Sequence, residues 1–537
     1  MRPPSACVAC RDRRKRCHRP RRGTSCTFCI ARGLQCTVEQ TPGAARPRGY
    51  EPLVSPGGNP GGNSALMPDR DLCNELVDLY FRYIHVTFHN LFHRPSFEHG
   101  LRDGSIPKIL VFAVFGLSAR FSSHPSFAGV DPRERGRPYA KEAERLLDLH
   151  KTCLTTIQAC VLLGAVQVAE MDSATESIFY TIACRLAMIL DLPNAPAETR
   201  LEQEVNLRVW WSVVTTDTWS STAMGLPRAI QPRHDIPMPM DERVFLALTS
   251  ADPPVSQQGR DAVVSPRSEL STSLIAQMIK LNGILYDINT FNTQLVSGIL
   301  QELGARDAVT KLSAALDAWR SELPTDMEYT RDNLLYWAGR GCGASFVVLH
   351  LNYNHSSQLL FYSFLHSSLA LDHHHDDAST TPTSAYAAKC KSHAASLCEI
   401  MYAAAAAADA PAAVEVLYPL AGHMLVVAST VHLHALLFSA DDAEIALAKA
   451  RLEHNFGIIT RLQTYWPSLH ASFSRLAAFH RACLDDKSNN DNLNDDAGGG
   501  GTFRLDRWML RFLLDFAKPV GERDRRGREV RHRLPPT

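Results

Sequence analysis

The chain has 537 residues, 45% of them hydrophobic, and its 56 Lys and Arg residues balance its 56 Asp and Glu residues. This length and apolar content suffice for a large buried core, built as several domains or as one large helical body with an appendage. No run of about 18 apolar residues is apparent and the N-terminus lacks an apolar secretory signal, so we expect an intracellular protein with reduced thiols and no membrane partner.

The positive charge is concentrated at the N-terminus. Residues 1–50 hold twelve Lys and Arg residues against two acidic ones, an excess of ten positive charges. Because the whole chain is neutral, residues 51–537 hold an equal acidic excess. A basic head on an acidic body favours a polyanion as the partner of the head.

Six of the fourteen cysteines form two copies of the pattern C-x2-C-x6-C near the N-terminus: Cys7, Cys10, Cys17, Cys26, Cys29 and Cys36. Five basic residues lie inside the first copy and one inside the second. In a reducing compartment, such a cluster indicates a metal site rather than disulfides. A structural zinc ion takes four ligands. Two ions therefore need eight ligand positions, which six thiolates fill if two of them bridge both metals.

This frame resembles the binuclear zinc cluster of fungal transcription factors, in which six cysteines hold two zinc ions. The resemblance implies that Cys7 and Cys26 bridge the two ions and that the other four cysteines each bind one. We take residues 1–40 as this zinc-cluster domain. A redox or zinc-storage head is the alternative, which explains the six cysteines but not the one-sided arginines.

The resemblance also implies a short helix, beginning near Cys10, that enters the major groove of double-stranded DNA. Arginine pairs with guanine O6 and N7, and the family tends to read GC-rich, CGG-like triplets. By carry-over from the family, Arg13 and Arg14 are the candidates for base contacts. The residues expected to contact mostly phosphates are Arg11, Lys15, Arg16, Arg19, Arg21 and Arg22. The alternative is a solvated basic loop that serves only as a nuclear import signal.

Residues 41–70 are rich in proline and glycine and contain no heptads, which predicts a flexible linker. Many relatives place a coiled coil here. Proline costs about 3 kcal/mol inside a helix and glycine about 1 kcal/mol, so we expect no zipper. A homodimer would then have to form through the helical body.

Residues 71–485 are predicted to form an all-α body, because apolar residues recur there at helical spacing. A hinge is predicted at 92–97, and buried apolar packing for the eight cysteines outside the head. Apolar helical runs are predicted at 107–119, 138–149, 155–170, 177–191 and 203–224. After the body we expect a disordered acidic loop at 486–501, a C-terminal helix at 502–520 and a charged tail at 521–537.

The body resembles the middle homology region of the same fungal family, most specifically in the stretch "EVNLRVWWSVVTTDTWSSTAMGLPRAI" at 204–230. The residues of this stretch in family register are Glu204, Arg208, Trp210, Trp211, Asp217, Gly225 and Pro227. The tryptophans have two interpretations. One is a regulatory contact, and the favoured one is core packing, with Arg208 paired to Glu204 or Asp217.

These features together predict a nuclear, zinc-dependent, DNA-binding regulator of RNA polymerase II transcription. The family resemblance also implies a pathway-specific role. A small-molecule effector or a co-regulator protein is a candidate partner of the body. An enzyme is the competing class, since His373, His374 and His375 are flanked by aspartates that could bind metal. That stretch is of low complexity, and no Walker loop, G-x-S-x-G elbow or H-E-x-x-H motif occurs. We therefore predict that the chain is not an enzyme.

Overall fold

The computed structural model of the chain describes most of the residues after position 65. The described residues are Cys26, 66–255 apart from 86, 88, 232 and 234, 273–300, 302–365, 382–406, 414–494, 522–523 and 529–530. Residues 1–63 and 64–537 are two separate units. The helices and strands of the described residues all belong to the second unit.

The fold is all-α, as predicted from the apolar spacing. The N-terminal half holds α3 (Arg70–Tyr83), α4 (Arg94–Asp103), α5 (Lys108–Ser118), α6 (Pro132–Arg135), α7 (Arg137–Leu146), α8 (Leu154–Glu170), α9 (Ser173–Ile189), α10 (Arg200–Met224) and α11 (Glu242–Ala247). The C-terminal half holds α14 (Leu274–Ser297), α15 (Glu302–Ser321), α16 (Arg331–Ala338), α17 (Gly343–Phe361), α18 (Pro382–Ala406), α19 (Pro419–Phe438), α20 (Asp442–Gln463) and α21 (Ser468–Asn494). Short 3-10 turns lie at Ala119–Phe121, Pro125–Phe127, Leu192–Asn194, Thr325–Met327 and Tyr362–Phe364. Two two-residue strands, β1 (Glu522–Arg523) and β2 (Glu529–Val530), pair antiparallel.

The start of the body follows from local sequence signals. Asp69 caps α3 by accepting a hydrogen bond from the backbone N of Leu72 at 2.9 Å. The predicted hinge at 92–97 is only half correct, because α4 begins within it at Arg94. Pro95 lies in the first turn of α4, where a missing backbone N–H costs no helical hydrogen bond. The five predicted helical runs are found as α5, α7, α8, α9 and α10, although α7 ends at Leu146, three residues before the predicted end at 149.

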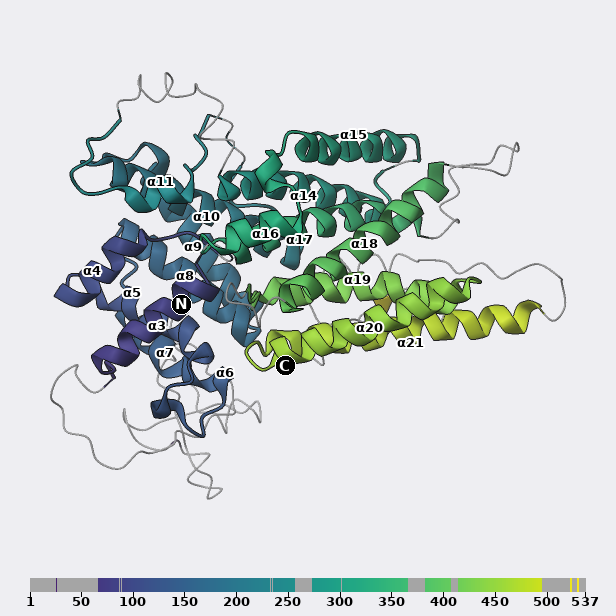
Figure 1. The fold of residues 1–537 in the computed structure, drawn as a ribbon, viewed down its shortest axis with the longest axis horizontal. Helices are drawn as coiled ribbons and strands as arrows, with labels where there is room; N and C mark the ends of the chain where they lie inside the picture. Colours follow the sequence, from purple (N-terminus) through teal and green to yellow (C-terminus); the bar gives the residue numbers. More distant parts are fainter. Residues whose placement is uncertain are drawn as a thin grey trace. The chain divides into compact units, whose positions relative to one another are not determined.

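A first core forms among the helices of the N-terminal half (Figure 1). Eleven consecutive residues of α8, from Thr156 to Val166, are buried, because α8 packs against α5, α7, α9 and α10. The closest approach is at Gly164, where an added Cβ would lie 2.3 Å from Cε1 of Tyr180 on α9. Glycine at this position therefore lets the two helices pack closely.

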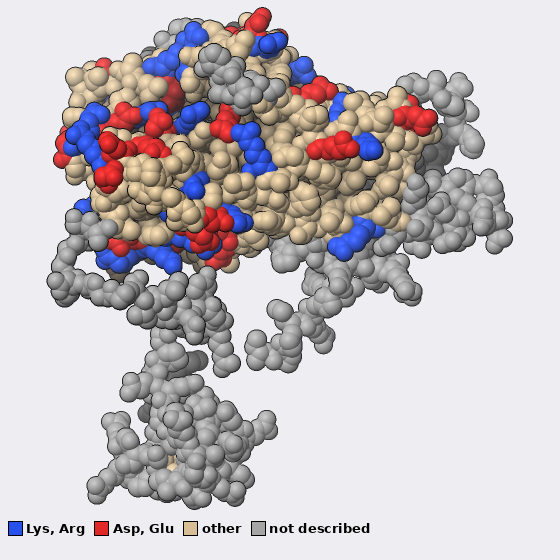
Figure 2. All heavy atoms as spheres, turned by 60° about the horizontal axis from the view of Figure 1, so that its bottom comes forward, with Lys and Arg blue, Asp and Glu red and all other residues tan. Residues whose placement is uncertain are grey.

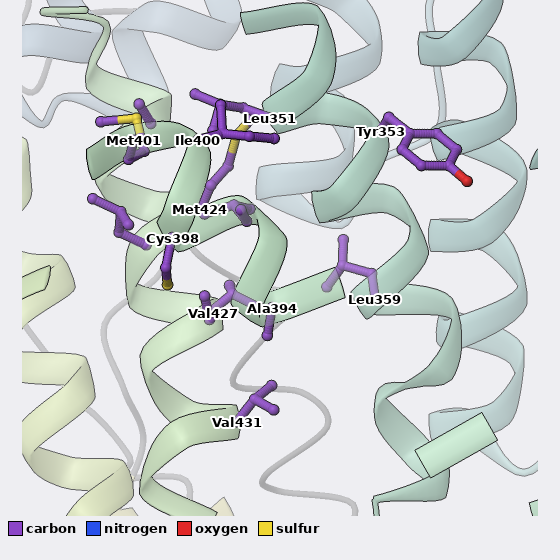
Figure 3. Close-up of a cluster of buried hydrophobic side chains, with 14 of the residues drawn as sticks. Leu351, Tyr353, Leu359, Ala394, Cys398, Ile400, Met401, Met424, Val427 and Val431 are labelled. Carbon is purple, nitrogen blue, oxygen red and sulfur yellow. The ribbon is translucent and has the colours of Figure 1, made fainter. Parts of the chain in front are cut away.

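A second core surrounds α17, in which every residue from Ser345 to Phe361 is buried. This helix packs against α14, α15, α16, α18 and α19. Figure 3 shows side chains of α17, α18 and α19 meeting in this core, among them Leu351, Ile400 and Met424. The α19, α20 and α21 helices run side by side in Figure 1 and pack on one another.

The C-terminal half also completes the first core. Leu462 at the end of α20, Trp466 in the turn that follows and Leu469 at the start of α21 all pack in the N-terminal cluster. Arg120, which is only 2% exposed, donates from Nη1 to the carbonyl of Tyr465 at 3.1 Å and lies 4.5 Å from the Trp466 ring. The two halves are therefore joined by shared packing and by a buried cation.

One helix corrects the expectation that no long apolar run exists. By length and composition α19 could cross a membrane, with a mean hydropathy of 1.5 over its most apolar window. However, 78% of that window is buried inside the protein. Such burial is typical of a core helix, which passes the same test of length and composition.

Two further expectations differ from the structure. Residues 486–494, predicted to be disordered, continue α21 to Asn494, and residues 495–501 lie outside the described part of the chain. Of the eight cysteines predicted to be buried, Cys153 is exposed and Cys342 is half-buried. Cys153 precedes α8 as its N-cap residue, so it does not share the buried face of that helix.

The surface of the body carries both signs of charge. On the face shown in Figure 2, the basic and acidic side chains of the described residues are interspersed. A protein surface that binds a duplex neutralises several phosphates with Lys and Arg. This face has no such extended basic area among the described residues.

Candidate functional site

The α10 helix and the loop after it carry the most distinctive stretch of the body. Thr199 caps α10 by accepting a hydrogen bond from the backbone N of Glu202 at 3.1 Å. Trp210 and Trp211 are 3% and 8% exposed, and Nε1 of Trp211 donates to the carbonyl of Pro237 at 2.8 Å. The two tryptophans are thus core residues, and the packing interpretation is confirmed.

Arg208, one turn after Glu204, is the most buried cation of α10, with 1% of its side chain exposed. Its Nε donates to Glu204 at 2.8 Å, its Nη1 donates to Glu242, and its Nη2 donates to the carbonyl of Met240 at 2.8 Å. The guanidinium also lies 3.7 Å from the centre of the Phe245 ring. These contacts tie the segment around α11 to the start of α10.

The electrostatics of this group favour a charged arginine. Burial acts to lower the pKa of Arg208, but the carboxylates of Glu242 and Glu204 outweigh it and raise that pKa. The predicted pairing with Glu204 is confirmed, whereas Asp217 makes other contacts. The contribution of Glu242 was not predicted, because it lies 34 residues along the chain and no local pattern links it to Arg208.

Asp217 shapes the loop that follows α10. The helix ends at Gly225, whose φ of 62° is in the left-handed region that glycine adopts without strain. The carboxylate of Asp217 then accepts hydrogen bonds from the backbone N of Ala229 at 3.1 Å and of Ile230 at 2.9 Å. The loop is thereby held against its own helix, and Arg228 within it is held over the Tyr286 ring of α14 at 4.5 Å.

Two histidines lie in the buried segment between α3 and α4. His89 Nε2 is 2.9 Å from the hydroxyl of Tyr80, and His85 Nε2 accepts a hydrogen bond from the backbone N of Phe92 at 3.3 Å. Burial is the main cause that lowers the pKa of each to about 3, and Arg208 adds to the effect at His85. Both imidazoles are therefore neutral at pH 7.

These histidines make the fold sensitive to acid. An unfolded histidine has a pKa near 6.5, so between pH 6.5 and about 3 the unfolded chain binds a proton that the folded chain does not. Stability is thus fully present above pH 6.5 and is lost as the pH falls. Between pH 7.5 and pH 5.5, the free energy of unfolding of the wild type should fall by about 1.4 kcal/mol more than that of His89→Gln. Urea unfolding of both proteins at both pH values measures this difference. Equal losses for wild type and variant would contradict this, and His150→Gln, at an exposed position, is the control.

Cys398 and His432 are the nearest approach to a catalytic pair among the described residues. The Cys398 Sγ lies 3.4 Å from His432 Nε2 and accepts a hydrogen bond from Asn455 at 3.4 Å. Burial is the main cause that raises the pKa of Cys398 to about 11 and lowers that of His432 to about 4. Both groups are neutral and inaccessible, so the pair lacks the thiolate that a nucleophile needs.

The predicted metal and DNA-binding residues all lie in residues 1–40. Of these, only Cys26 is among the described residues, and it is buried. His373, His374 and His375, the linker up to residue 65 and the predicted C-terminal helix at 502–520 also lie outside the described part of the chain. Within the described part, no group of three or more His, Cys, Asp or Glu side chains could hold a metal ion.

Known proteins similar to this chain are transcription regulators. Residues 77–321 match the fungal specific transcription factor domain. A Schizosaccharomyces pombe protein named as an uncharacterized transcriptional regulatory protein is 27% identical over 56% of this chain and 33% of its own length. The Zn(2)-C6 fungal-type transcription factor FTF1c of Fusarium oxysporum is 24% identical over 84% of this chain and 50% of its own length.

The chain spans about half the length of these relatives or less. The domain match and the relatives' names together support the interpretation of this chain as a fungal transcription regulator. The names of these relatives are those of transcription regulators and not of enzymes.

Proposed function

We propose that this chain is a zinc-dependent, sequence-specific DNA-binding regulator of RNA polymerase II transcription that acts in the nucleus. The observation that carries the proposal is the doubled C-x2-C-x6-C frame with five basic residues in only one of its copies. The frame precedes a helical body that matches the fungal specific transcription factor domain. A DNA-binding head joined to such a body fits a pathway-specific regulator.

The donor set of the head fits zinc. Thiolates suit structural zinc, and six of them can serve two tetrahedral ions if two are shared. Cys7 and Cys26 would be the shared ligands, and Cys10, Cys17, Cys29 and Cys36 would each bind one ion. The burial of Cys26 supports a ligand role. When bound, zinc would supply the crosslinks that a segment with few apolar residues needs in order to fold.

The basic residues of the first copy are proposed to contact DNA. A helix N-terminus and clustered arginines both attract phosphate, and the arginine fork matches the O6 and N7 acceptors of guanine. The face of the body in Figure 2 mixes both signs of charge, so DNA contacts are assigned to the head and not to this face. The body is assigned the regulatory role. A homodimer, a co-regulator protein and a small-molecule effector are its proposed partners.

Replacing Arg14 should change sequence preference. If Arg14 pairs with a guanine, Arg14→Ala should weaken binding to a CGG-containing duplex by about 1–3 kcal/mol and relax the preference at that base. The measurement is a titration of matched duplexes that differ at one base pair. An Arg14→Ala protein with unchanged base preference would remove this residue from base recognition.

Arg21→Ala is the matched control for Arg14→Ala. Arg21 lies after the first cysteine copy and is assigned to phosphate contacts, which carry no sequence information. This variant should bind all duplexes more weakly to the same degree. Its slope of log affinity against log salt concentration should fall by about one.

The function as a whole is tested by selecting bound duplexes from a random pool with purified full-length protein. Recovery of a shared GC-rich triplet would support a sequence-specific regulator. Recovery of unrelated duplexes that release equally with salt would leave only non-specific binding, and the proposal would then be wrong.

A further inference from the structure

The outer face of α9 is apolar, whereas the solvent-exposed face of a helix is normally polar. Ile178 and Ile189 on this face are 58% and 61% exposed, while the opposite face of α9 packs on α8 and α10. The exposed face of α15 shows the ordinary pattern, since it carries Arg306, Asp307 and Lys311. Exposed apolar side chains that gather on one face of an element mark an interaction surface.

These isoleucines belong to a stripe with the spacing of a coiled-coil seam. The α9 stripe consists of Thr175, Ile178, Ile182, Arg185 and Ile189, at alternating intervals of three and four residues. All five residues are exposed or half-buried. Intervals of this kind keep a seam on one side of a helix, so that a second helix can pack along it.

The α9 stripe is complementary to itself when two copies run antiparallel. Its positions, and Met171 just before the helix, lie in pairs at equal distances on either side of Tyr180 in the sequence: Ile178 with Ile182, Thr175 with Arg185, and Met171 with Ile189. Around a twofold axis at this point, each member of a pair faces the other member on the second copy. Isoleucine then meets isoleucine at the centre, and the half-exposed Met171 covers the last residue of the stripe.

The charges of α9 select the antiparallel direction. Between positions 171 and 189 the exposed charged residues are Asp172 at the start and Arg185 near the end, since Glu176 is buried. Arg185 makes no hydrogen bond or ion pair with any residue that the structure describes. Antiparallel pairing places it three residues, about 4.5 Å along the axis, from the partner's Asp172. Parallel pairing would instead bring like charges together, which is costly.

Asp172 can accept this further contact. It caps α9 by accepting hydrogen bonds from the backbone N of Thr175 at 3.0 Å and from its Oγ1 at 2.7 Å. These hydrogen bonds lower the pKa of Asp172, so its side chain is a carboxylate at neutral pH. A carboxylate offers about four acceptor positions, which leaves room for a guanidinium.

We infer that the α9 stripe is the surface on which two copies of this chain pair, antiparallel and around a twofold axis near Tyr180. A second copy is favoured over another partner because the stripe itself supplies every complementary position. The inference rests on the proposed function in one respect: the linker at 41–70 is predicted to hold no zipper, so the proposed homodimer needs a surface on the body. Pairing is measured without DNA, so its failure and a failure of DNA binding are separate results.

The length of the stripe sets the strength of the pairing. With 17 residues, α9 is about 25 Å long. A seam of that length buries less than the roughly 1,200–2,000 Å² of a stable interface. The free chains therefore pair with a dissociation constant between about 1 µM and 1 mM. Two heads on neighbouring half-sites of one duplex raise the effective concentration of the bodies and strengthen their pairing.

Sedimentation of the full-length chain without DNA tests the surface. The wild type should pass from monomer to dimer between about 1 µM and 1 mM. Ile178→Asp should raise the dissociation constant at least about tenfold, since it buries an unpaired charge at two symmetric places. Leu447→Asp is the matched control, because Leu447 on α20 is 49% exposed and lies outside the stripe. A wild type that stays monomeric, or an Ile178→Asp protein that dimerises as the wild type does, would overturn the inference.

Disulfide trapping tests the antiparallel register and does not depend on the folding of Ile178→Asp. Positions 175 and 185 of the two copies face each other in this register, whereas the two copies of position 175 lie about 15 Å apart along the axis. A disulfide needs Cα atoms within about 7 Å. Under mild oxidation, a mixture of Thr175→Cys and Arg185→Cys should therefore form a linked dimer. Either variant alone should stay at the level of the wild type, which controls for the 14 native cysteines. Linkage of either variant by itself above that level, or no linkage in the mixture, would show that the register is wrong.

Discussion

Removal of zinc should abolish DNA binding while leaving the helical body folded. Structural zinc sites contribute about 10–16 kcal/mol of apparent binding free energy, more than the stability of a typical domain. A head without its metal should therefore unfold, and affinity for a specific duplex should fall about 10³-fold or more. Metal analysis of the purified chain should give two zinc ions. The measurements are duplex titration and far-UV circular dichroism before and after a chelator.

The cysteines of head and body provide the control for this experiment. Cys10→Ser should remove a zinc ligand and lose specific DNA binding. Cys153→Ser changes an exposed thiol of the body and should leave both zinc content and binding unchanged. A content of one zinc ion, or DNA binding that survives the chelator, would rule out the shared-thiolate cluster.

Loss of Arg208 should strongly destabilise the described body. Arg208→Met leaves the carboxylate of Glu204, which is 5% exposed, without its cation and frees the segment around Glu242. Breaking a buried ion pair from one side costs about 3–5 kcal/mol. The midpoint of urea unfolding should fall accordingly with an unchanged slope.

An exposed arginine shows how much of this loss comes from burial. Arg233 pairs with Asp235 and Asp191 at the surface, and Arg233→Met should cost at most about 1 kcal/mol. Adding Glu204→Gln to Arg208→Met should recover part of the loss, because it removes the stranded charge. Equal losses for Arg208→Met and Arg233→Met would show that the buried cluster contributes little.

The helices were predictable because their signal is local. Apolar residues three and four apart define a buried face within a single segment, and the predicted run at 203–224 is found in α10 (Arg200–Met224). The boundary at 92–97 was only half predicted, because a proline is compatible both with a hinge and with the first turn of a helix, and Pro95 lies in the first turn of α4. The continuation of α21 through residues 486–494 was missed, since Asn and Asp there are weak helix formers.

The contacts of the site depend on positions far apart in the chain. The pairing of Arg208 with Glu204 was predictable from a spacing of one helical turn. The contact with Glu242 was not, because it depends on how a loop returns to α10. The same is true of Arg228 and Tyr286, which meet only because Asp217 folds the loop onto its helix. Candidate zinc ligands are easier to predict from the sequence, because structural zinc sites use cysteines at short, typical spacings along the chain.

The docking of Leu462, Trp466 and Leu469 into the N-terminal core has a consequence for biosynthesis. A ribosome makes the first core's helices long before it makes these three residues. Until then, the apolar surface that they cover, together with Arg120, stays open to water. Nascent chains with such exposed surface are prone to aggregate and need chaperones. The body therefore matures late in translation, and a premature stop before residue 469 leaves even its earliest helices without a closed core.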